Sequence, residues 1–144
     1  MKLDLKLGQK ATWRRRIEAE HVRMYRDITG DANPLHFDDA YARSTTFGRL
    51  IVHGGITAGA LNALVAERMP GPGSVFIKQE LEYVGPAHVG DELIAHGEVV
   101  WLHDTKPVCR LDVRVTASGP GESGERLCLK GQCVVYRAVP SSGT

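Results

Sequence analysis

Hydrophobic and polar residues alternate along most of the second half of the chain. Apolar side chains recur at odd positions in four stretches, residues 75–83, 93–101, 109–117 and 127–135. Charged or polar residues fill the positions between, and Gly, Pro, Asp and Ser are frequent in the turns. A period of two with one apolar face is typical of antiparallel strands that cover something apolar. We therefore expect four long strands, and a fifth over residues 11–17.

The first half of the chain shows helical spacing instead. Residues 18–28 carry apolar side chains three positions apart, which predicts one helix face, and a short helical segment with an acidic start is expected over 38–43. Residues 56–69 form the clearest helix, rich in Ala and followed by Pro-Gly-Pro-Gly. Because this helix is apolar on nearly all sides, we expect it to be buried.

These elements predict a single α+β domain in which an antiparallel sheet wraps around a long central helix. The chain of 144 residues suits one domain, which we place at residues 1–139, with a disordered tail at 140–144. A domain of this size leaves about a third of its unfolded surface exposed. Pairing with a second copy would therefore be useful.

Charge and cysteine content narrow the function classes. The net charge is +1, and the basic run at residues 14–16 would alternate between the two faces of a strand, so we expect neither a nucleic-acid nor a membrane partner. The three cysteines form no C-x-x-C pair, the N-terminus lacks an apolar secretory segment, and no apolar run is long enough to span a membrane. These features predict a cytoplasmic protein.

The first candidate for chemistry lies at residues 29–39, which read TGDANPLHFDD. Gly30 favours a helix stop and Pro34 disfavours both helix and core strand, so we expect a stiff, kinked loop. Asp31 and His36 could meet across it and share one water, an arrangement suited to proton transfer. The alternative is structural: Asp31 caps the loop and His36 bonds a backbone carbonyl. Asn33 is better suited to holding the turn.

The second candidate lies at residues 50–59, which read LIVHGGITAG. Gly54 and Gly55 stand at the expected start of the central helix, where free N–H groups and the helix dipole could form an oxyanion hole. The alternative is a tight turn that needs glycine at positive φ. His53 could face a ligand or be a hydrogen-bonded loop residue. Asn62, two helical turns beyond Gly54, could face the same way or be a buried, satisfied amide.

A metal site is a rival interpretation. Asp31, His36 and His53 could form a two-histidine, one-carboxylate set. Their spacing matches no metal signature and the chain has no i,i+4 histidine pair, so we expect no metal. Phosphate-loop, dinucleotide and Gly-x-Ser-x-Gly patterns are also missing from the sequence.

Taken together, three stretches resemble one family. Residues 29–42, TGDANPLHFDDAYA, resemble the hydratase-2 motif of the MaoC-like (R)-specific enoyl-CoA hydratases; residues 47–56, FGRLIVHGGI, are similar to the segment that follows it there, and residues 70–93 to its first sheet strands. The likeness runs from about residue 7 to residue 135. It implies a hot-dog fold and a homodimer or higher oligomer, with an acyl-CoA thioester tunnel at the subunit interface and no cofactor.

The resemblance also implies residue roles. Asp31 and His36 would activate water, and the Gly54 N–H would polarise the thioester carbonyl. Water would then add reversibly, in the syn sense, to a trans-2-enoyl-CoA and give an (R)-3-hydroxyacyl-CoA. We expect the substrate to be bound by four further residues: Asn33, His53, Gly55 and Asn62.

The sequence departs from the family pattern at three positions that bear on the acyl pocket. Leu50 stands where proline is common, Gly55 where methionine is common, and Asn62 where bacterial relatives carry serine. Four basic residues are candidates for contacting the CoA phosphates: Arg43, Arg49, Lys78 and Lys106.

Two alternatives to the hydratase stay open. An acyl-carrier-protein dehydratase would share the fold, but such enzymes resemble a pattern with a catalytic acid on the central helix. Here that helix has no acid before Glu67, which also disfavours thioesterases of this fold. The other alternative is a non-catalytic acyl-CoA binding module, which the presence of both Asp31 and His36 disfavours.

Overall fold

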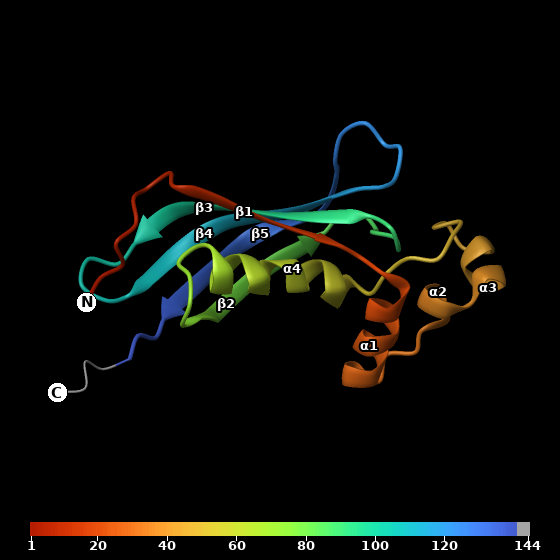
Figure 1. Cartoon of the computed structure of the whole chain (residues 1–144), viewed down its shortest axis with the longest axis horizontal. Coiled ribbons are helices and arrows are strands. Elements are labelled where there is room, and N and C mark those ends of the chain that lie inside the picture. Colours follow the sequence, from red (N-terminus) through yellow and green to blue (C-terminus); the bar gives the residue numbers. More distant parts are fainter. Residues whose placement is uncertain (141–144) are drawn as a thin grey trace.

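The computed structural model describes residues 1–140 and shows a five-stranded antiparallel sheet with one long helix along it (Figure 1). The predicted α+β class is confirmed. Beyond residue 140, the predicted tail lies outside the described residues. The elements, in chain order, are β1 (Lys10–Arg16), α1 (Ala19–Thr29), α2 (Pro34–Phe37), α3 (Asp39–Arg43), α4 (Gly54–Glu67), β2 (Ser74–Tyr83), β3 (Glu92–Leu102), β4 (Val108–Ser118) and β5 (Arg126–Arg137).

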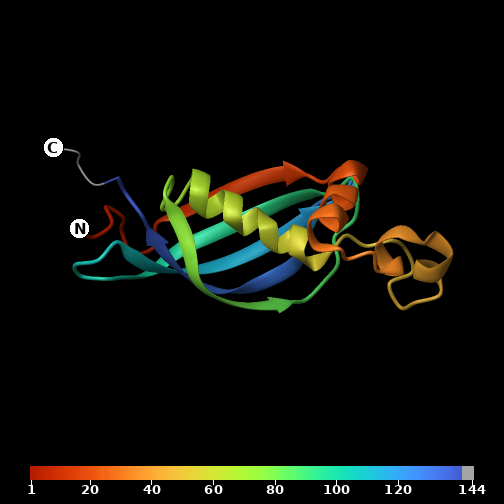
Figure 2. The same cartoon turned by 90° about the horizontal axis from the view of Figure 1, so that it is seen from below.

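The strands are ordered β1-β3-β4-β5-β2, so β1 and β2 form the sheet edges. Helix α4 lies across the concave face of this sheet (Figure 2). Leu61 and Leu64 on α4 are fully buried against it. On β3, a Cβ added to Gly97 would lie 3.0 Å from Leu64 Cδ2, so glycine lets the helix approach the sheet closely. Burying one leucine contributes about 1.5–3 kcal/mol.

The predicted face of β2 is wrong for two residues. Val75 and Ile77 are 54% and 59% exposed, whereas Phe76 packs against the core. The pairing of β2 with β5 shifts between Phe76 and Lys78, which inserts an extra residue into the edge strand. Such a bulge changes which side chains face the core, so an alternating sequence no longer alternates in space.

The prediction that the central helix is buried on all sides is also wrong. One side of α4 packs on the sheet, but Asn62 is exposed and Ile56 and Ala63 are half-buried. The reason is that a single sheet covers a single side of the helix. The prediction that Asn62 is a buried amide is therefore corrected: its side chain is open to solvent in this protomer.

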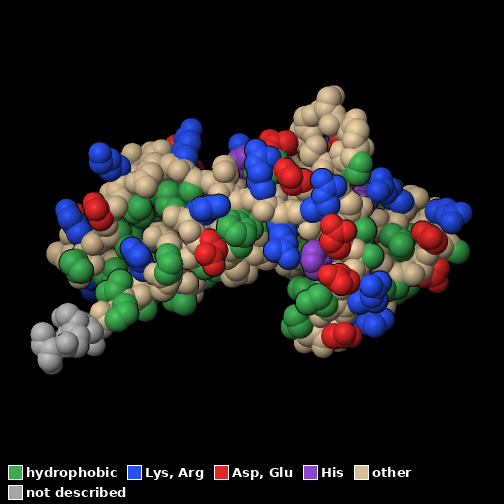
Figure 3. All heavy atoms as spheres, in the orientation of Figure 1, with side chains coloured by type: hydrophobic (Ala, Val, Ile, Leu, Met, Phe, Trp, Pro, Cys, Tyr) green, Lys and Arg blue, Asp and Glu red, His purple; other side chains and the backbone are tan. Residues whose placement is uncertain are grey.

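Residues of α2 and α3 project beyond the end of the sheet, while α1 lies against the start of α4 (Figure 2). On the face shown in Figure 3, acidic and basic side chains are interspersed, as the near-neutral composition leads one to expect. Within residues 1–140, no helix has both the length and the apolar character needed to cross a bilayer.

Candidate active site

The loop after α1 is held by its own side chains. Helix α1 ends at Gly30 with φ 79°. The Asp31 N–H then donates to Thr29 Oγ1 at 3.1 Å, the Asn33 N–H donates to Asp31 Oδ1 at 3.0 Å, and the Leu35 N–H donates to Asn33 Oδ1 at 3.0 Å. These three bonds form a two-residue repeat in which each side chain fixes the backbone ahead of it. Asn33 thus has a capping role.

One part of the expected loop is helical. Pro34 begins the single turn of α2, where its missing N–H costs no bond because the first helical N–H has no intrahelical acceptor. The prediction of an uninterrupted kinked loop to residue 36 is therefore wrong. His36 instead projects from a short helix, which fixes the direction of its ring.

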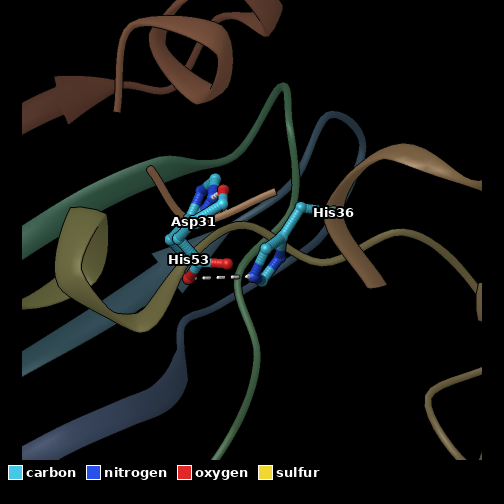
Figure 4. Close-up of side chains that lie close together, drawn as sticks. All are labelled: Asp31, His36 and His53. Atoms are coloured by element: carbon cyan, nitrogen blue, oxygen red, sulfur yellow. Dashed lines mark hydrogen bonds and ion pairs between the residues drawn. The ribbon is translucent and has the colours of Figure 1, made fainter. Parts of the chain in front are cut away.

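Asp31 and His36 meet as predicted. His36 Nε2 lies 3.9 Å from Asp31 Oδ2, and the two side chains are 7% and 45% exposed (Figure 4). The His36 Nδ1–H donates to the Ile51 carbonyl at 2.8 Å, so in the neutral ring Nε2 carries the lone pair. The structural interpretation is therefore confirmed, since Asp31 caps the loop and His36 bonds a backbone carbonyl, while the proton-transfer role stays a prediction. Each side chain uses one polar atom for structure and leaves the other free.

His53 joins this loop to the start of α4. Its side chain is 1% exposed, and its Nε2–H donates to the Asp31 carbonyl at 2.9 Å. Its ring centroid lies 3.8 Å from that of His36 and 4.8 Å from that of Tyr25. His53 Nδ1 is buried and has no hydrogen-bond partner among residues 1–140. The predicted hydrogen-bonded loop histidine is confirmed for Nε2, while Nδ1 is left with an unused lone pair.

The structure also brings together the three residues of the metal hypothesis. Donor atoms of Asp31, His36 and His53 all lie within 4.8 Å of one another. However, a metal ion lies in the plane of each imidazole that binds it, about 2.0–2.1 Å from the nitrogen for zinc. The two imidazole rings are stacked with 34° between their planes, so their lone pairs do not converge at that distance. This donor set fits a metal poorly.

The two glycines at the start of α4 are needed for close approach and not for backbone conformation. Neither Gly54 nor Gly55 has positive φ, so the predicted alternative of a strained turn is wrong. A Cβ on Gly54 would lie 2.9 Å from Tyr83 Cε1, and one on Gly55 would overlap the Tyr25 hydroxyl. Sequence reasoning missed both tyrosines because it treated them only as apolar positions of a helix and a strand.

The candidate residues border two cavities. The first, of about 450 Å³, is lined by His36 and by the basic residues Arg23, Arg26 and Arg49. The second, of about 370 Å³, is lined by Gly54 and has mostly apolar walls. A basic cavity that includes His36 and an apolar cavity that includes Gly54 suit a ligand with an anionic part and an apolar part.

Family comparison agrees with this geometry. The MaoC-like domain family matches residues 4–119. The chain belongs to the MaoC-like family. It is 37% identical over 132 residues to an (R)-specific enoyl-CoA hydratase of Aeromonas caviae, covering 92% of this chain and 95% of the relative. It is 33% identical over 132 residues to a 3-hydroxybutyryl-CoA dehydratase of Methylorubrum extorquens, covering 92% and 80%.

The fold of this MaoC-like protein is the hot-dog fold. A solved structure of the (R)-hydratase from A. caviae involved in PHA biosynthesis aligns with a TM-score of 0.84 at 36% identity and covers 94% of this chain and 98% of that one. The sheet wrapped around a central helix, which the sequence resemblance implied, is therefore confirmed.

Two groups of the MaoC-like chain stay apart from the site. Asn62 lies eight residues beyond Gly54, about 12 Å along the helix, and the structure does not bring it to Asp31 and His36.

Burial raises the pKa of the Cys109 and Cys133 thiols to about 11, so neither supplies a thiolate nucleophile at neutral pH. Of the four predicted phosphate contacts, Arg49 lines the basic cavity; Lys78 instead pairs with Glu80 at 2.7 Å on β2.

Proposed function

We propose that this MaoC-like protein is an (R)-specific enoyl-CoA hydratase, which adds water reversibly and in the syn sense to trans-2-enoyl-CoA. One observation carries the proposal: Asp31 Oδ2 and His36 Nε2 stand free, 3.9 Å apart, in a loop that uses their other polar atoms for structure. The named relatives support the reaction class and the thioester substrate.

The free atoms of Asp31 and His36 are arranged to hold and activate one water. A water about 2.8 Å from each atom can donate one O–H to Asp31 Oδ2 and the other to His36 Nε2. Its remaining lone pairs then point away from both and toward the substrate Cβ. As the C–O bond forms, Asp31 takes the proton from the water. The same carboxyl group can return a proton to Cα on the same face, which makes the addition syn.

The charge that develops during addition collects on the thioester oxygen. The Gly54 N–H, first in the 14-residue helix α4, would donate to that oxygen. The aligned peptide dipoles of the helix add a favourable partial positive charge there. Without a side chain, Gly54 also leaves room for the ligand beside Tyr83.

The two cavities suggest how an acyl-CoA would lie. The basic cavity beside His36 suits the anionic CoA portion, with Arg23, Arg26 and Arg49 as phosphate contacts. The mostly apolar cavity beside Gly54 suits the acyl chain. Asp31, His36 and Gly54 would carry the chemistry, while His53 and Gly55 would shape the site. Asn33 would act through the loop that it caps.

We propose a homodimer as the working form. The edge strand β2 exposes Val75 and Ile77, and the side of α4 that carries Asn62 is uncovered. A second copy could cover both, and it would bring Asn62 to the interface where the family resemblance puts the substrate tunnel. The unpaired cysteines fit a reducing compartment, which we take to be the cytoplasm.

The alternative of an acyl-carrier-protein dehydratase concerns the carrier, since the chemistry is the same reaction in reverse. Helix α4 carries no carboxylate before Glu67 at its far end, so the acid would again have to be Asp31. The three arginines of the basic cavity favour the smaller, phosphate-rich CoA.

The function is tested by following the loss of enoyl-thioester absorbance with crotonyl-CoA and by determining the chirality of the product. The proposal expects rapid hydration to (R)-3-hydroxybutyryl-CoA, unchanged after treatment with EDTA. Crotonyl-pantetheine, which lacks the phosphates of the nucleotide, should show a raised KM. An (S)-product, or tight binding of crotonyl-CoA and longer enoyl-CoAs without turnover, would contradict the proposal; the second outcome would support a binding module.

A further inference from the structure

The Tyr25 hydroxyl occupies the place of the side chain that Gly55 lacks. A Cβ added to Gly55 would overlap Tyr25 Oη and crowd the ring behind it. No other residue's hydroxyl is among the atoms that an added Cβ would meet at a described glycine. The close fit means that a larger residue at position 55 and a tyrosine at position 25 cannot both keep these positions.

Two features of this pair are unfavourable for folding alone. Glycine weakens a helix relative to alanine, and Gly55 stands in the first turn of α4. The Tyr25 hydroxyl makes no hydrogen bond to another residue within 1–140, although the side chain is half-buried. Phenylalanine at position 25 would avoid the unpaired hydroxyl, but an alanine Cβ at position 55 would still meet the aromatic ring. A ligand that accepts a hydrogen bond from the hydroxyl would offset both costs.

The hydroxyl lies close to the start of α4, where the proposed oxyanion donor stands. It lies against Gly55, the residue that follows Gly54, and the Gly54 N–H is the proposed oxyanion donor. The Tyr25 ring packs at 4.8 Å on His53, and His53 stacks at 3.8 Å on His36. Tyr25 itself is half-buried.

We propose that Tyr25 is a further catalytic residue whose hydroxyl donates a second hydrogen bond to the thioester oxygen held by Gly54, and that Gly55 is required to make room for it. The inference rests on the proposed hydratase function. As water adds to Cβ and the carbonyl oxygen gains negative charge, this bond shortens and strengthens; the Tyr25 proton stays on its oxygen. A preorganised donor of this kind acts mainly on the transition state.

The test compares Tyr25→Phe and Gly55→Ala with the wild-type protein in crotonyl-CoA hydration. Tyr25→Phe keeps the ring and should lower kcat by about a hundredfold, the usual cost of one oxyanion donor. Gly55→Ala should cause a similar loss because the added Cβ displaces the hydroxyl. The double variant should lose no more than the larger single loss, because both changes remove the same bond.

Gly59→Ala is the matched control on the same helix, since a Cβ there meets nothing within 4 Å. It should leave kcat unchanged. A second readout separates donation from packing: butyl-CoA thioether, which lacks the carbonyl oxygen, should bind wild-type and Tyr25→Phe protein equally.

Full kcat in Tyr25→Phe, or weaker thioether binding in proportion to the lost activity, would overturn the role of Tyr25. Failure of the wild-type protein to hydrate any enoyl thioester would instead overturn the proposed function, so the two failures are distinguishable.

Discussion

The sheet with α4 and the segment from Thr29 to His53 are stabilised in different ways. In the first region, long strands share backbone ladders and cover a helix whose leucines are fully buried. In the second, successive side chains bond the backbone two residues ahead, and two histidines bond carbonyls far along the chain. The first region obtains its stability from buried area, whereas the second obtains a defined shape from a few polar bonds.

This difference bears on why we propose that the chemistry lies in the segment. A polar atom in the sheet interior would be costly unless it were bonded. In the segment, Asp31 and His36 each have one bonded and one free atom, with Asp31 half-exposed and His36 largely buried. The bonded atoms orient the free ones, and such preorganisation would favour the proposed proton transfer. The body of the fold contributes the start of α4 and the walls of the cavities.

The largest effect is expected from His36→Gln, which removes the free Nε2 of the segment. Hydration of crotonyl-CoA should fall by about a hundredfold or more, the usual contribution of a general acid–base group. The thermal midpoint should fall as well, since the variant loses both the bond to Ile51 and the ring packing on His53, so activity is compared per folded molecule. Steady-state kinetics and a melting curve check both. Activity above a tenth of wild type would contradict the assignment.

Leu64→Ala, in the region formed by the sheet and α4, should lower stability and leave activity unchanged. Leu64 is fully buried between α4 and β3, so its truncation should lower the free energy of unfolding by about 2–5 kcal/mol. Activity per folded molecule should stay near wild type. Urea denaturation measures the first effect. Glu67→Ala, on the exposed end of the same helix, is the control and should change stability by well under that amount.

Asn33→Ala probes the bonds within the segment. It removes the oxygen that accepts the Leu35 N–H at the start of α2 and should cost about 1 kcal/mol of stability. Activity should fall several-fold, because the direction of His36 depends on that turn. Asn33→Asp keeps an acceptor oxygen and should restore both properties. If Asn33→Asp matched Asn33→Ala, the cap would not be the reason for the effect.

The smallest effect concerns His96 on the sheet. Burial, with Arg114 next in importance, lowers the pKa of His96 in the folded protein. The unfolded chain therefore takes up this proton first, and stability should fall as pH drops through the unfolded value of about 6.5. His96→Gln should flatten that slope slightly without changing activity at neutral pH. Urea midpoints from pH 5 to 8 measure it; a steeper slope in the variant would refute it.

The two regions also differ in what could be predicted. The period of two predicts the strands well, and the Ala-rich helix is confirmed with a shift of two residues. The predicted core-facing side of β2 was wrong at the bulge. A bulge depends on pairing with β5, and the local pattern of hydrophobic residues does not indicate it. The open side of α4 could not be predicted either, since an apolar helix looks the same whether a sheet or another subunit covers it.

In the site, Asp31 and His36 could be paired from a short range of sequence because a proline-containing turn joins them. His53 and the two tyrosines could not be placed in the same way. They reach the site from α1, β2 and the start of α4, and only tertiary packing brings these elements together. The positions with glycine were a usable signal, since a pair of glycines opening a helix indicates that something approaches the backbone closely.

The most direct test of the account is Asp31→Asn, measured for hydration and for stability in the same preparation. Asparagine keeps the oxygen that accepts the Asn33 N–H but cannot take a proton from water. We predict a loss of crotonyl-CoA hydration of about a hundredfold or more with an unchanged thermal midpoint. Asp104→Asn, in the β3–β4 turn at the far end of the sheet, should leave both unchanged. Full activity in Asp31→Asn would contradict the central claim that this loop uses one carboxylate oxygen for its fold and the other for its chemistry.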